Sequence, residues 1–565
     1  MSRDPRDLQN DALFYTSLLG PPSLGQDHSS CSFDSRACTA SNVNDSKEYI
    51  NKHAVDGCEC DYIVIPTGSG SECAVAIERG DIPIVHLQDD GEDLSVDICP
   101  HRTKPKTLVE KLKRFLLLFV PWVRRSNPIP YTALSHVWAD GLGDPKDNRL
   151  HRCQMKRLAR LLKSLPSHTP YDETSGLLPA QKTTSPSEVS ECYFWMDTLC
   201  VPVNNQKLRN KAIERMREVY EEAANVLVLD AELMRHSTAG GYKEIFTRIS
   251  CSNWVRRLWT LQEAIFNRNL LFQFSDRATY VGAGSKLQRE QKADNKLRPC
   301  DLVAWECDRY SFDFQVVLPY WDRTQQINFI WNALESRTTS RSGDEPLCLA
   351  ILLGLNLKKF KRQPDAFTVK KFWSLNTQGI PASILFLPGP KLQDEGYRWA
   401  PASLIDLKIM GGEQSLTAHV TPRGLRVKYP AFLLSPPQHP VKSVVPFEAD
   451  GQLFYLRGVT ANGSPSGEAT KLHKRANLAF LILGLVMGED TAAGGHEVGL
   501  GALVSGGVSK RGVRYGEYLM LISFVKKGSW REQHPNVPYS KEEQQEKLAD
   551  PCKATYLPVQ EWCVS

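Results

Sequence analysis

The sequence predicts an α/β protein in which one domain holds a parallel sheet and the C-terminal half is a mixed α+β region. The first indication is residues 194–230, where an apolar strand pattern, a polar turn, an amphipathic helix and a second apolar run follow one another. Two parallel strands need such a crossover, and an apolar run without alternation is typical of a strand buried on both faces. The second indication is that similar units recur between residues 129 and 276, as expected for a sheet covered by helices on both sides.

The first 128 residues divide into two predicted parts. Residues 1–57 are rich in Ser, Asp and Asn without periodicity, so we expect a flexible leader. Residues 58–128 are predicted to form a prefix, with short strands at 62–66, 82–87 and 94–98 and one amphipathic helix at 107–119. The basic outer face of that helix leaves a second interpretation open, which is docking on a membrane surface.

The α/β domain itself is predicted at residues 129–276. Its expected strands lie at 131–135, 193–196, 225–229 and 270–274, and its expected helices lie at 154–165, 206–224, 241–249 and 253–266. A polar insertion at 168–188 interrupts the series. After a charged linker at 277–319, residues 320–565 are predicted to be first helical, with a polar break at 336–346, and then β-rich, because short apolar runs alternate there with Pro and Gly turns.

Composition favours a cytoplasmic protein of more than one domain. The chain has 565 residues, of which 41% are hydrophobic and 24% are charged, as in a globular protein. A net charge of +5 is weak for this length and gives no support for nucleic-acid binding. We expect no signal peptide, because the first residues are polar, and no transmembrane segment, because the longest apolar runs are too short. The 15 cysteines are scattered along the chain, which fits reduced thiols better than a disulfide framework.

Polar residues follow two of the predicted parallel strands and indicate a binding site. Ser135, His136 and Trp138 leave the first strand together, and Asp197 follows the second. In sheets of this kind, ligands bind in a crevice at the carboxyl ends of the strands. We expect Trp138 to stack on a planar ring of the ligand, or else to be a structural residue under its loop. Asp197 either orients a ribose or accepts backbone N–H bonds in its own turn.

Four blocks of the sequence, taken together, resemble the fungal heterokaryon-incompatibility (HET) domain. They occur in order at residues 131–138 (YTALSHVW), 194–200 (FWMDTLC), 212–220 (AIERMREVY) and 257–263 (RLWTLQE). Two later segments, 337–346 (RTTSRSGDEP) and 396–401 (GYRWAP), are similar to regions that follow this domain in large fungal proteins. The resemblance implies a role in non-self recognition and programmed cell death. It also implies that the parallel-sheet domain is TIR-like, which is a flavodoxin-like α/β fold.

Glu263 is the candidate catalytic residue, and the candidate rests on the resemblance. Residues 252–264 are similar to a segment of plant TIR domains whose Glu cleaves NAD. NAD is therefore the implied substrate rather than a bound cofactor, with Ser135, His136, Trp138 and Asp197 forming its pocket. A carboxylate suits this reaction, because breaking the nicotinamide–ribose bond passes through an oxocarbenium-like state. The alternative is that Glu263 pairs with Arg256 or Arg257, or caps a loop.

Three functional interpretations remain open from the sequence. The first is an NAD-cleaving effector of cell death, and the second is a non-catalytic module that signals by self-assembly or through an unidentified protein partner of incompatibility. The third is a hydrolase with Cys200 as nucleophile, His136 as base and Asp197 as orienting acid.

No metal site is predicted. Cys58 and Cys60, considered with Cys73, Cys99 and His101, lack the paired C-x-x-C spacing of a zinc site. Residues 66–71 (PTGSGS) are predicted to be a tight turn, because the Lys of a phosphate-binding loop is missing.

Overall fold

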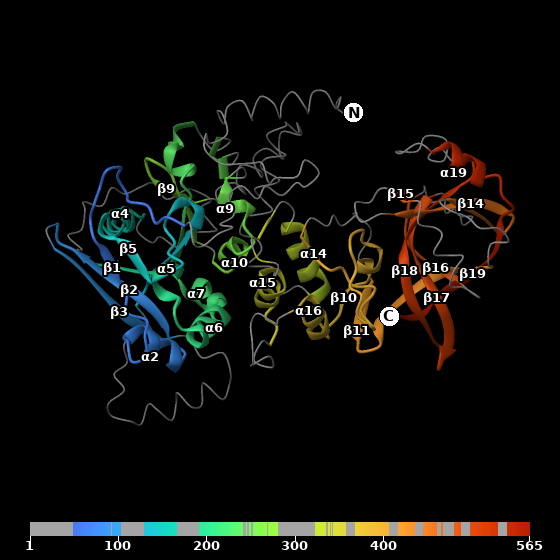
Figure 1. The fold of residues 1–565 in the computed structure, drawn as a ribbon, viewed down its shortest axis with the longest axis horizontal. Helices are drawn as coiled ribbons and strands as arrows, with labels where there is room; N and C mark the ends of the chain where they lie inside the picture. The colour runs from blue at the N-terminus through green and yellow to red at the C-terminus, as the bar shows by residue number, and fades with distance from the viewer. Residues whose placement is uncertain are drawn as a thin grey trace, which may run out of the picture. The chain divides into compact units, whose positions relative to one another are not determined.

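The structure is a computed structural model that separates the chain into two compact units (Figure 1). It describes residues 49–102, 129–166, 191–280, 322–356, 368–405, 416–435, 444–459, 465–466, 479–487, 498–528 and 539–565, apart from positions 92, 241–243, 246–247, 250–251, 268, 335–336, 340 and 342. Unit 1 comprises Met1–Tyr320 together with Ser336–Ser342, and unit 2 comprises Trp321–Glu335 and Gly343–Ser565. The predicted helix at 107–119 and the insertion at 168–188 lie outside the described residues.

A seven-stranded mixed sheet forms the core of unit 1. In spatial order its strands are β3 (Leu94–His101), β2 (Ile82–Asp89), β6 (Glu191–Met196), β4 (Thr132–His136), β7 (Asn225–Leu229), β8 (Leu270–Gln273) and β9 (Ala278–Tyr280). The pairs β6–β4, β4–β7 and β7–β8 are parallel, whereas β3–β2, β2–β6 and β8–β9 are antiparallel. The predicted parallel sheet is therefore confirmed only at its centre.

Two of the three strands expected in a separate prefix, β2 and β3, belong to this sheet instead. Val85 of β2 pairs with Phe194 of β6, so β2 lies inside the sheet and β3 forms its edge. The physical reason is the apolar run of β2, whose first four residues are all buried and which needs a neighbour on each side. At the other edge, Ala278–Tyr280, which were predicted to belong to the linker, form strand β9 and pair with β8.

Helices cover both faces of the central strands. Cys192 of β6 contacts Ala159 of α4 (Arg152–Lys163), whereas Trp195 packs edge-on against Tyr220 of α7 (Met216–Glu222). Side chains three residues apart on a strand point to opposite faces, so α4 and α7 lie on opposite sides of the sheet. In chain order the four parallel strands are β4, β6, β7 and β8, and their spatial order β6-β4-β7-β8 is doubly wound with its switch point between β4 and β7.

Two helices predicted as continuous are interrupted. The first is split into α6 (Gln206–Glu214) and α7 at Arg215. The second is split into α9 (Asn253–Arg256) and α10 (Thr260–Ile265). The second break has a clear cause, because the backbone N–H of Leu258 donates to the carbonyl of Thr338 at 2.9 Å instead of continuing a helix.

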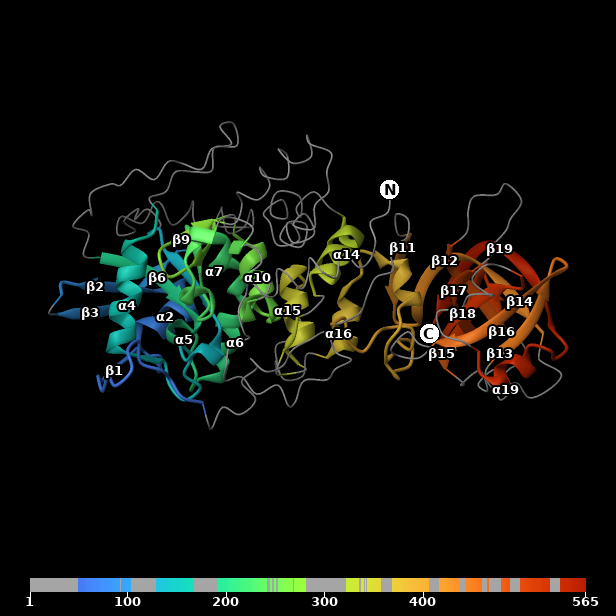
Figure 2. The same cartoon turned by 90° about the horizontal axis from the view of Figure 1, so that it is seen from above.

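Residues 49–64 add a small extension to unit 1. Strand β1 (Tyr62–Val64) pairs antiparallel with β5 (Arg149–His151), directly before α4. The Gly-containing turn at 66–71 leads into α2 (Glu72–Arg79), whose N-terminus Ser71 caps, and α2 lies against β2 and β3 (Figure 2). Residues 49–57, part of the predicted leader, are bonded to the domain; for example, Lys52 N–H donates to the Gly141 carbonyl at 2.9 Å.

Unit 2 begins with helices and continues as a large, mostly antiparallel sheet. Its helices include α14 (Arg323–Ala333), α15 (Asp344–Leu352), α16 (Val369–Leu375) and α19 (Lys541–Glu546). Its strands are β10 (Ile380–Pro381), β11 (Thr417–Thr421), β12 (Gly424–Leu434), β13 (Val444–Ala449), β14 (Gln452–Val459), β15 (Pro465–Ser466), β16 (Ala479–Met487), β17 (Val498–Lys510), β18 (Val513–Lys526) and β19 (Cys552–Val564).

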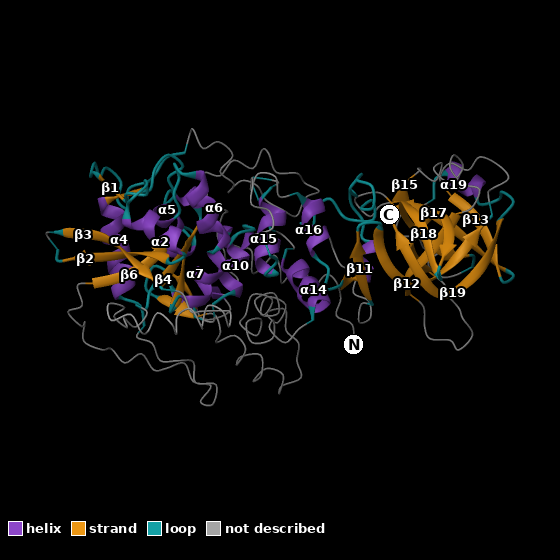
Figure 3. Ribbon diagram, turned by 90° about the horizontal axis from the view of Figure 1, so that it is seen from below, coloured by secondary structure: helices purple, strands orange, loops and turns teal. Residues whose placement is uncertain are grey.

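The sheet of unit 2 folds back on itself (Figure 3). Buried apolar side chains of its strands form a hydrophobic core. Strand β19 pairs with β12, β13 and β18, and β14 pairs with both β13 and β18. The core contains Phe432, Phe447 and Phe454, which contact one another. Among the described helices of the chain, none combines the length and the apolar character needed to cross a bilayer.

Candidate functional site

The carboxyl ends of β4, β6 and β7 bring the predicted site residues to one edge of the sheet. Ser135 and His136 are the last two residues of β4, and Asp197 follows β6 directly as the first residue of α5 (Asp197–Cys200). Ser135 and His136 are adjacent in a strand, so their side chains leave on opposite faces. The sequence-predicted residues therefore divide into two hydrogen-bonded groups, one around Glu263 and one around Asp197.

Glu263 lies in a buried group of hydrogen-bonded side chains. The hydroxyl of Ser135 donates a short hydrogen bond to Oε2 of Glu263, and Nε1 of Trp254 donates to the Ser135 hydroxyl at 2.5 Å. Tyr220 of α7 forms a side-chain hydrogen bond with the same carboxyl. Glu263 is 7% exposed and Ser135 is 1% exposed. The structure thus brings Glu263 and Ser135 into direct contact, although 128 residues separate them in the chain.

The position of Glu263 depends on a segment much later in the sequence. Arg337 is fully buried, and its Nη1 donates to the Arg257 carbonyl at 2.6 Å and to the Thr260 hydroxyl at 3.0 Å. The hydroxyl of Thr260 donates in turn to the Trp254 carbonyl at 2.6 Å. These bonds fix the junction of α9 and α10, and with it the first turn of the helix that carries Glu263.

Burial favours the neutral form of the Glu263 carboxyl. Burial raises the pKa of Glu263 from 4.5 to about 8. The hydrogen bond from Ser135, the charge of Arg257 and the bond with Tyr220 oppose this rise, and the negative charge of Asp197 reinforces it. A carboxyl group that titrates near neutral pH at the switch point of a doubly wound sheet is typical of a functional site.

The raised pKa of Glu263 predicts a pH-dependent stability. Between pH 4.5 and about 8 the folded chain holds a proton on Glu263 that the unfolded chain releases. The free energy of unfolding therefore falls as the pH rises across this window. Below pH 4.5 the stabilisation that comes from protonated Glu263 is fully present. Glu263→Gln mimics the neutral acid, so its stability relative to wild type should rise by on the order of 1–3 kcal/mol between about pH 5 and pH 8.5. Denaturant unfolding at both pH values measures the difference.

The matched control for this measurement is Glu221→Gln. Glu221 is a carboxyl of α7 that pairs with Arg217 at the surface. Its substitution should leave the pH dependence of unfolding unchanged. A Glu263→Gln variant whose stability relative to wild type is the same at both pH values would contradict the raised pKa.

Asp197 is an ionised carboxylate held by three donors. Its Oδ1 lies 2.7 Å from His136 Nε2 and accepts the Thr198 backbone N–H at 2.7 Å, and its Oδ2 accepts Trp138 Nε1 at 2.9 Å. Burial alone would raise the pKa of Asp197, but the charge of His136 and these hydrogen bonds lower it below its usual value. The side chain of Asp197 remains 30% exposed, whereas that of His136 is 1% exposed.

One face of the Trp138 ring packs against the protein, as expected for a structural residue. Trp138–Asp140 form the short helix η1, and the backbone of Gly143 lies so close to the Trp138 ring that a Cβ there would come within 2.6 Å of it. The indole N–H is already bonded to Asp197. Stacking of Trp138 on a ligand, as expected from the sequence, remains a prediction for the other face of the ring.

One further carboxyl group at this edge, that of Asp230, is not among the residues predicted from the sequence. Asp230 follows β7 and accepts the backbone N–H groups of Glu232, Leu233 and Trp254 at 3.0, 3.2 and 3.0 Å. Burial and the nearby charge of Asp140 raise the pKa of Asp230 to about 6. Its sequence position could have indicated Asp230 as a site residue, because Asp230 directly follows β7 just as Asp197 directly follows β6. Tyr220 and Trp254 lie in the segments 212–220 and 252–264, but nothing in these segments indicates contact with Glu263.

Cys200 lacks the features of a nucleophile. It is the last residue of α5 and is fully buried. Burial raises the pKa of the Cys200 thiol well above its usual value, which disfavours the reactive thiolate. The bond between His136 and Asp197 is the one that a Cys–His–Asp arrangement requires, so only the burial of the thiol counts against this interpretation.

Fold and site together define an α/β domain with acidic side chains at the switch point of a doubly wound sheet. Comparison with known families adds that residues 131–244 match the model described as "Heterokaryon incompatibility protein (HET)". The chain therefore contains a HET domain, which implies a role related to heterokaryon incompatibility. No curated protein and no solved structure matches the chain. The matched residues include Ser135, His136, Trp138 and Asp197, whereas Glu263 lies beyond them.

Proposed function

We propose that this protein is an effector of non-self recognition that triggers programmed cell death by cleaving NAD. The observation that carries the proposal is the buried Glu263 carboxyl, with a pKa of about 8, bonded to Ser135 at the switch point of the sheet. The HET domain supports the biological role. The order of the four parallel strands supports a TIR-like, flavodoxin-like fold, in which the switch point is the expected ligand site.

In the proposed reaction, the bond between nicotinamide nitrogen and ribose C1′ breaks and its electron pair stays on the nitrogen. Nicotinamide leaves as a neutral molecule, and water adds to C1′ and releases a proton. The carboxylate of Glu263 stabilises the positive charge that develops on the ribose. The nicotinamide ring of NAD is itself cationic, so its arrival lowers the pKa of Glu263 and favours the carboxylate form.

The second acidic group of the site has a distinct part in this proposal. Asp197 is ionised and partly exposed, so it is suited to accept hydrogen bonds from ribose hydroxyls. Nδ1 of His136 is buried and has no hydrogen-bond partner within the described part of the chain. A buried polar atom without a partner is costly, and a ligand or water bound beside it would relieve that cost.

The proposed reaction also depends on access to Glu263. Since Glu263 is 7% exposed, NAD must displace part of the group formed by Trp254 and Tyr220 to reach it. We propose that self-assembly in the cytoplasm, where NAD is available, favours this open state.

Nicotinamide release from NAD tests the proposal directly. Purified full-length protein is incubated with NAD at low and at high protein concentration, and also after fusion to a forced dimerisation module. We expect nicotinamide to appear, and its rate per chain to increase with assembly. Absence of nicotinamide release under all three conditions would reject the proposal that this protein cleaves NAD.

A non-catalytic role is the second candidate, because one observation favours it. The Glu263 carboxyl is already bonded to Ser135 and Tyr220, as expected for a residue that holds α10 in place. In this case the domain signals by assembly or through a protein partner of incompatibility. A strain carrying Glu263→Gln distinguishes the two, because a normal death response with normal protein level would favour the non-catalytic module.

A further inference from the structure

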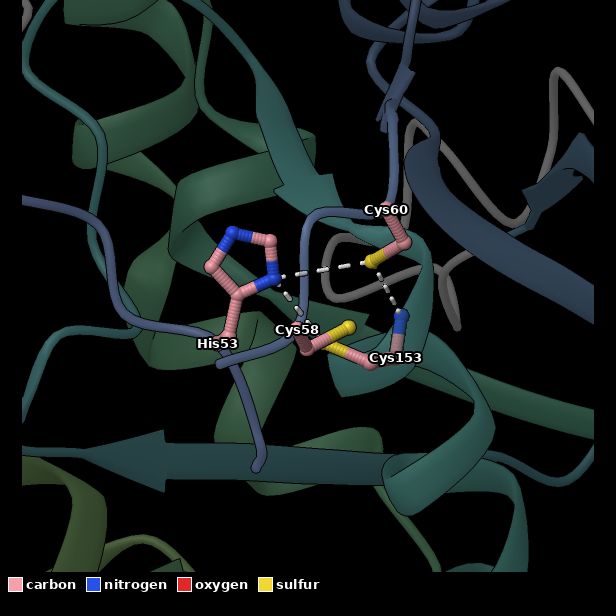
Figure 4. Close-up of side chains that lie close together, drawn as sticks. All are labelled: His53, Cys58, Cys60 and Cys153. Atoms are coloured by element: carbon pink, nitrogen blue, oxygen red, sulfur yellow. Dashed lines mark hydrogen bonds between the residues drawn. The ribbon is translucent and has the colours of Figure 1, made fainter. Parts of the chain in front are cut away.

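Four side chains with metal-binding atoms converge beside the β1–β5 ribbon, away from the acidic site. His53, Cys58 and Cys60 precede β1, and Cys153 lies in the first turn of α4. Figure 4 shows the imidazole of His53 and the sulfur atoms of the three cysteines turned toward one another. The antiparallel pairing of Tyr62 with His151 brings the two segments together.

Two measured separations among these atoms match those of a tetrahedral zinc site, and the others are short enough for one ion to draw the ligands together. Nδ1 of His53 lies 3.6 Å from Sγ of Cys60 and 3.5 Å from Sγ of Cys153. All four candidate ligand atoms lie within 4.8 Å of one another. With Zn–S near 2.3 Å and Zn–N near 2.0 Å, tetrahedral geometry requires S···N separations of about 3.6 Å and S···S separations of about 3.8 Å.

Backbone N–H groups hold two of the sulfur atoms in the cluster. The backbone N–H of Ala54 donates to Sγ of Cys153 at 3.2 Å, and the backbone N–H of Cys153 donates to Sγ of Cys60 at 3.3 Å. Gly57 has a φ of 75°, which lets the chain turn sharply between His53 and Cys58.

We propose that His53, Cys58, Cys60 and Cys153 bind one Zn²⁺ in a structural site. Three thiolates and one imidazole complete a four-coordinate shell, so no position is left open for substrate. The sequence-based expectation of no metal rested on Cys58 and Cys60 with Cys73, Cys99 and His101, and did not include His53 or Cys153. Sγ of Cys73 instead donates to the Cys200 carbonyl, and His101 lies 3.3 Å from Glu222.

The proposed metal anchors a segment that touches the acidic site. The Tyr49 hydroxyl donates to the Trp138 carbonyl at 2.6 Å and accepts the Gly143 backbone N–H at 2.8 Å. Nδ2 of Asn51 donates to the Gly143 carbonyl at 2.9 Å. The zinc therefore fixes residues 49–60 against the loop that carries Trp138, and its loss should expose this segment to proteases.

Metal analysis of the full-length protein, purified with reductant, tests the proposal. We expect about one zinc per chain in the wild type, and less than about a tenth of that in Cys60→Ser and Cys153→Ser, because structural zinc is lost with its ligands. The matched control is Cys99→Ser, a partly exposed cysteine of β3 outside the cluster, which should keep its zinc.

A spectrum of the wild type covers the case in which the variants fail to fold. Co²⁺ added to the metal-stripped wild type should give the intense visible bands of tetrahedral thiolate coordination. A reduced wild type that neither contains zinc nor takes up Zn²⁺ or Co²⁺ would overturn the proposal. So would a folded Cys153→Ser variant with undiminished zinc, or peptide mapping of a disulfide within the cluster in protein purified with reductant.

Discussion

The Glu263→Gln variant is expected to release nicotinamide from NAD on the order of 10²- to 10³-fold more slowly than the wild type, the usual loss on removing one electrostatic stabiliser of a transition state. The amide keeps the shape of the side chain and a partner for Ser135, but it carries no negative charge to stabilise the ribose cation. The loss should therefore appear in kcat rather than only in KM. Initial rates of nicotinamide formation over a range of NAD concentrations measure both constants.

The pH dependence of the wild type provides an independent check on the same residue. The free enzyme should gain kcat/KM as the pH rises through about 8, because the carboxylate is the active form of Glu263. Glu221→Gln is the matched control and should retain both the rate and the pH profile. A Glu263→Gln variant with wild-type turnover, or a wild-type profile that is flat through this range, would exclude Glu263 as the catalytic group.

Arg337→Ala is expected to lower the free energy of unfolding by about 2–4 kcal/mol, because it removes charged hydrogen bonds in the core and leaves a cavity. Arg337 is fully buried and donates to the Arg257 carbonyl and the Thr260 hydroxyl. Its loss leaves that carbonyl without this donor and loosens the junction that orients α10. Denaturant unfolding, followed by tryptophan fluorescence, measures the change.

The matched control is Arg341→Ala, because Arg341 belongs to the same segment but is exposed. This variant should remain within about 0.5 kcal/mol of the wild type, as is usual for surface substitutions. Arg337→Lys keeps the charge but loses the planar guanidinium group. Its free energy of unfolding should therefore lie between those of Arg337→Ala and Arg341→Ala. Equal stability of Arg337→Ala and Arg341→Ala would show that the buried guanidinium does not stabilise the domain.

Local patterns were sufficient to predict the central strands and the edge that carries the site. Residues 194–230 contain β6, α6, α7 and β7 in the predicted order, because apolar runs and helical spacing are properties of neighbouring residues. Since carboxyl ends of parallel strands meet at one edge, Ser135 and Asp197 could be assigned to that edge from the sequence.

The remaining features depend on contacts between distant residues. The position of β2 beside β6 follows from pairing across more than 100 residues, so the prefix could not be recognised as part of the sheet. The break before α10 follows from Thr338, and the partners of Cys60 follow from the β1–β5 pairing. No local pattern contains this information, because each contact is decided by how whole elements pack.

The return of Ser336–Ser342 to unit 1 means that the α/β domain is not one continuous stretch of chain. A fragment that ends at Tyr320 would contain every strand of the seven-stranded sheet but would lack Arg337 and Thr338. Recombination at a single point after the sheet would therefore transfer an incomplete module. Helix α14, the first helix of unit 2, lies in the sequence between the two parts of unit 1. A gene segment that encodes the complete α/β domain therefore also encodes this helix of unit 2.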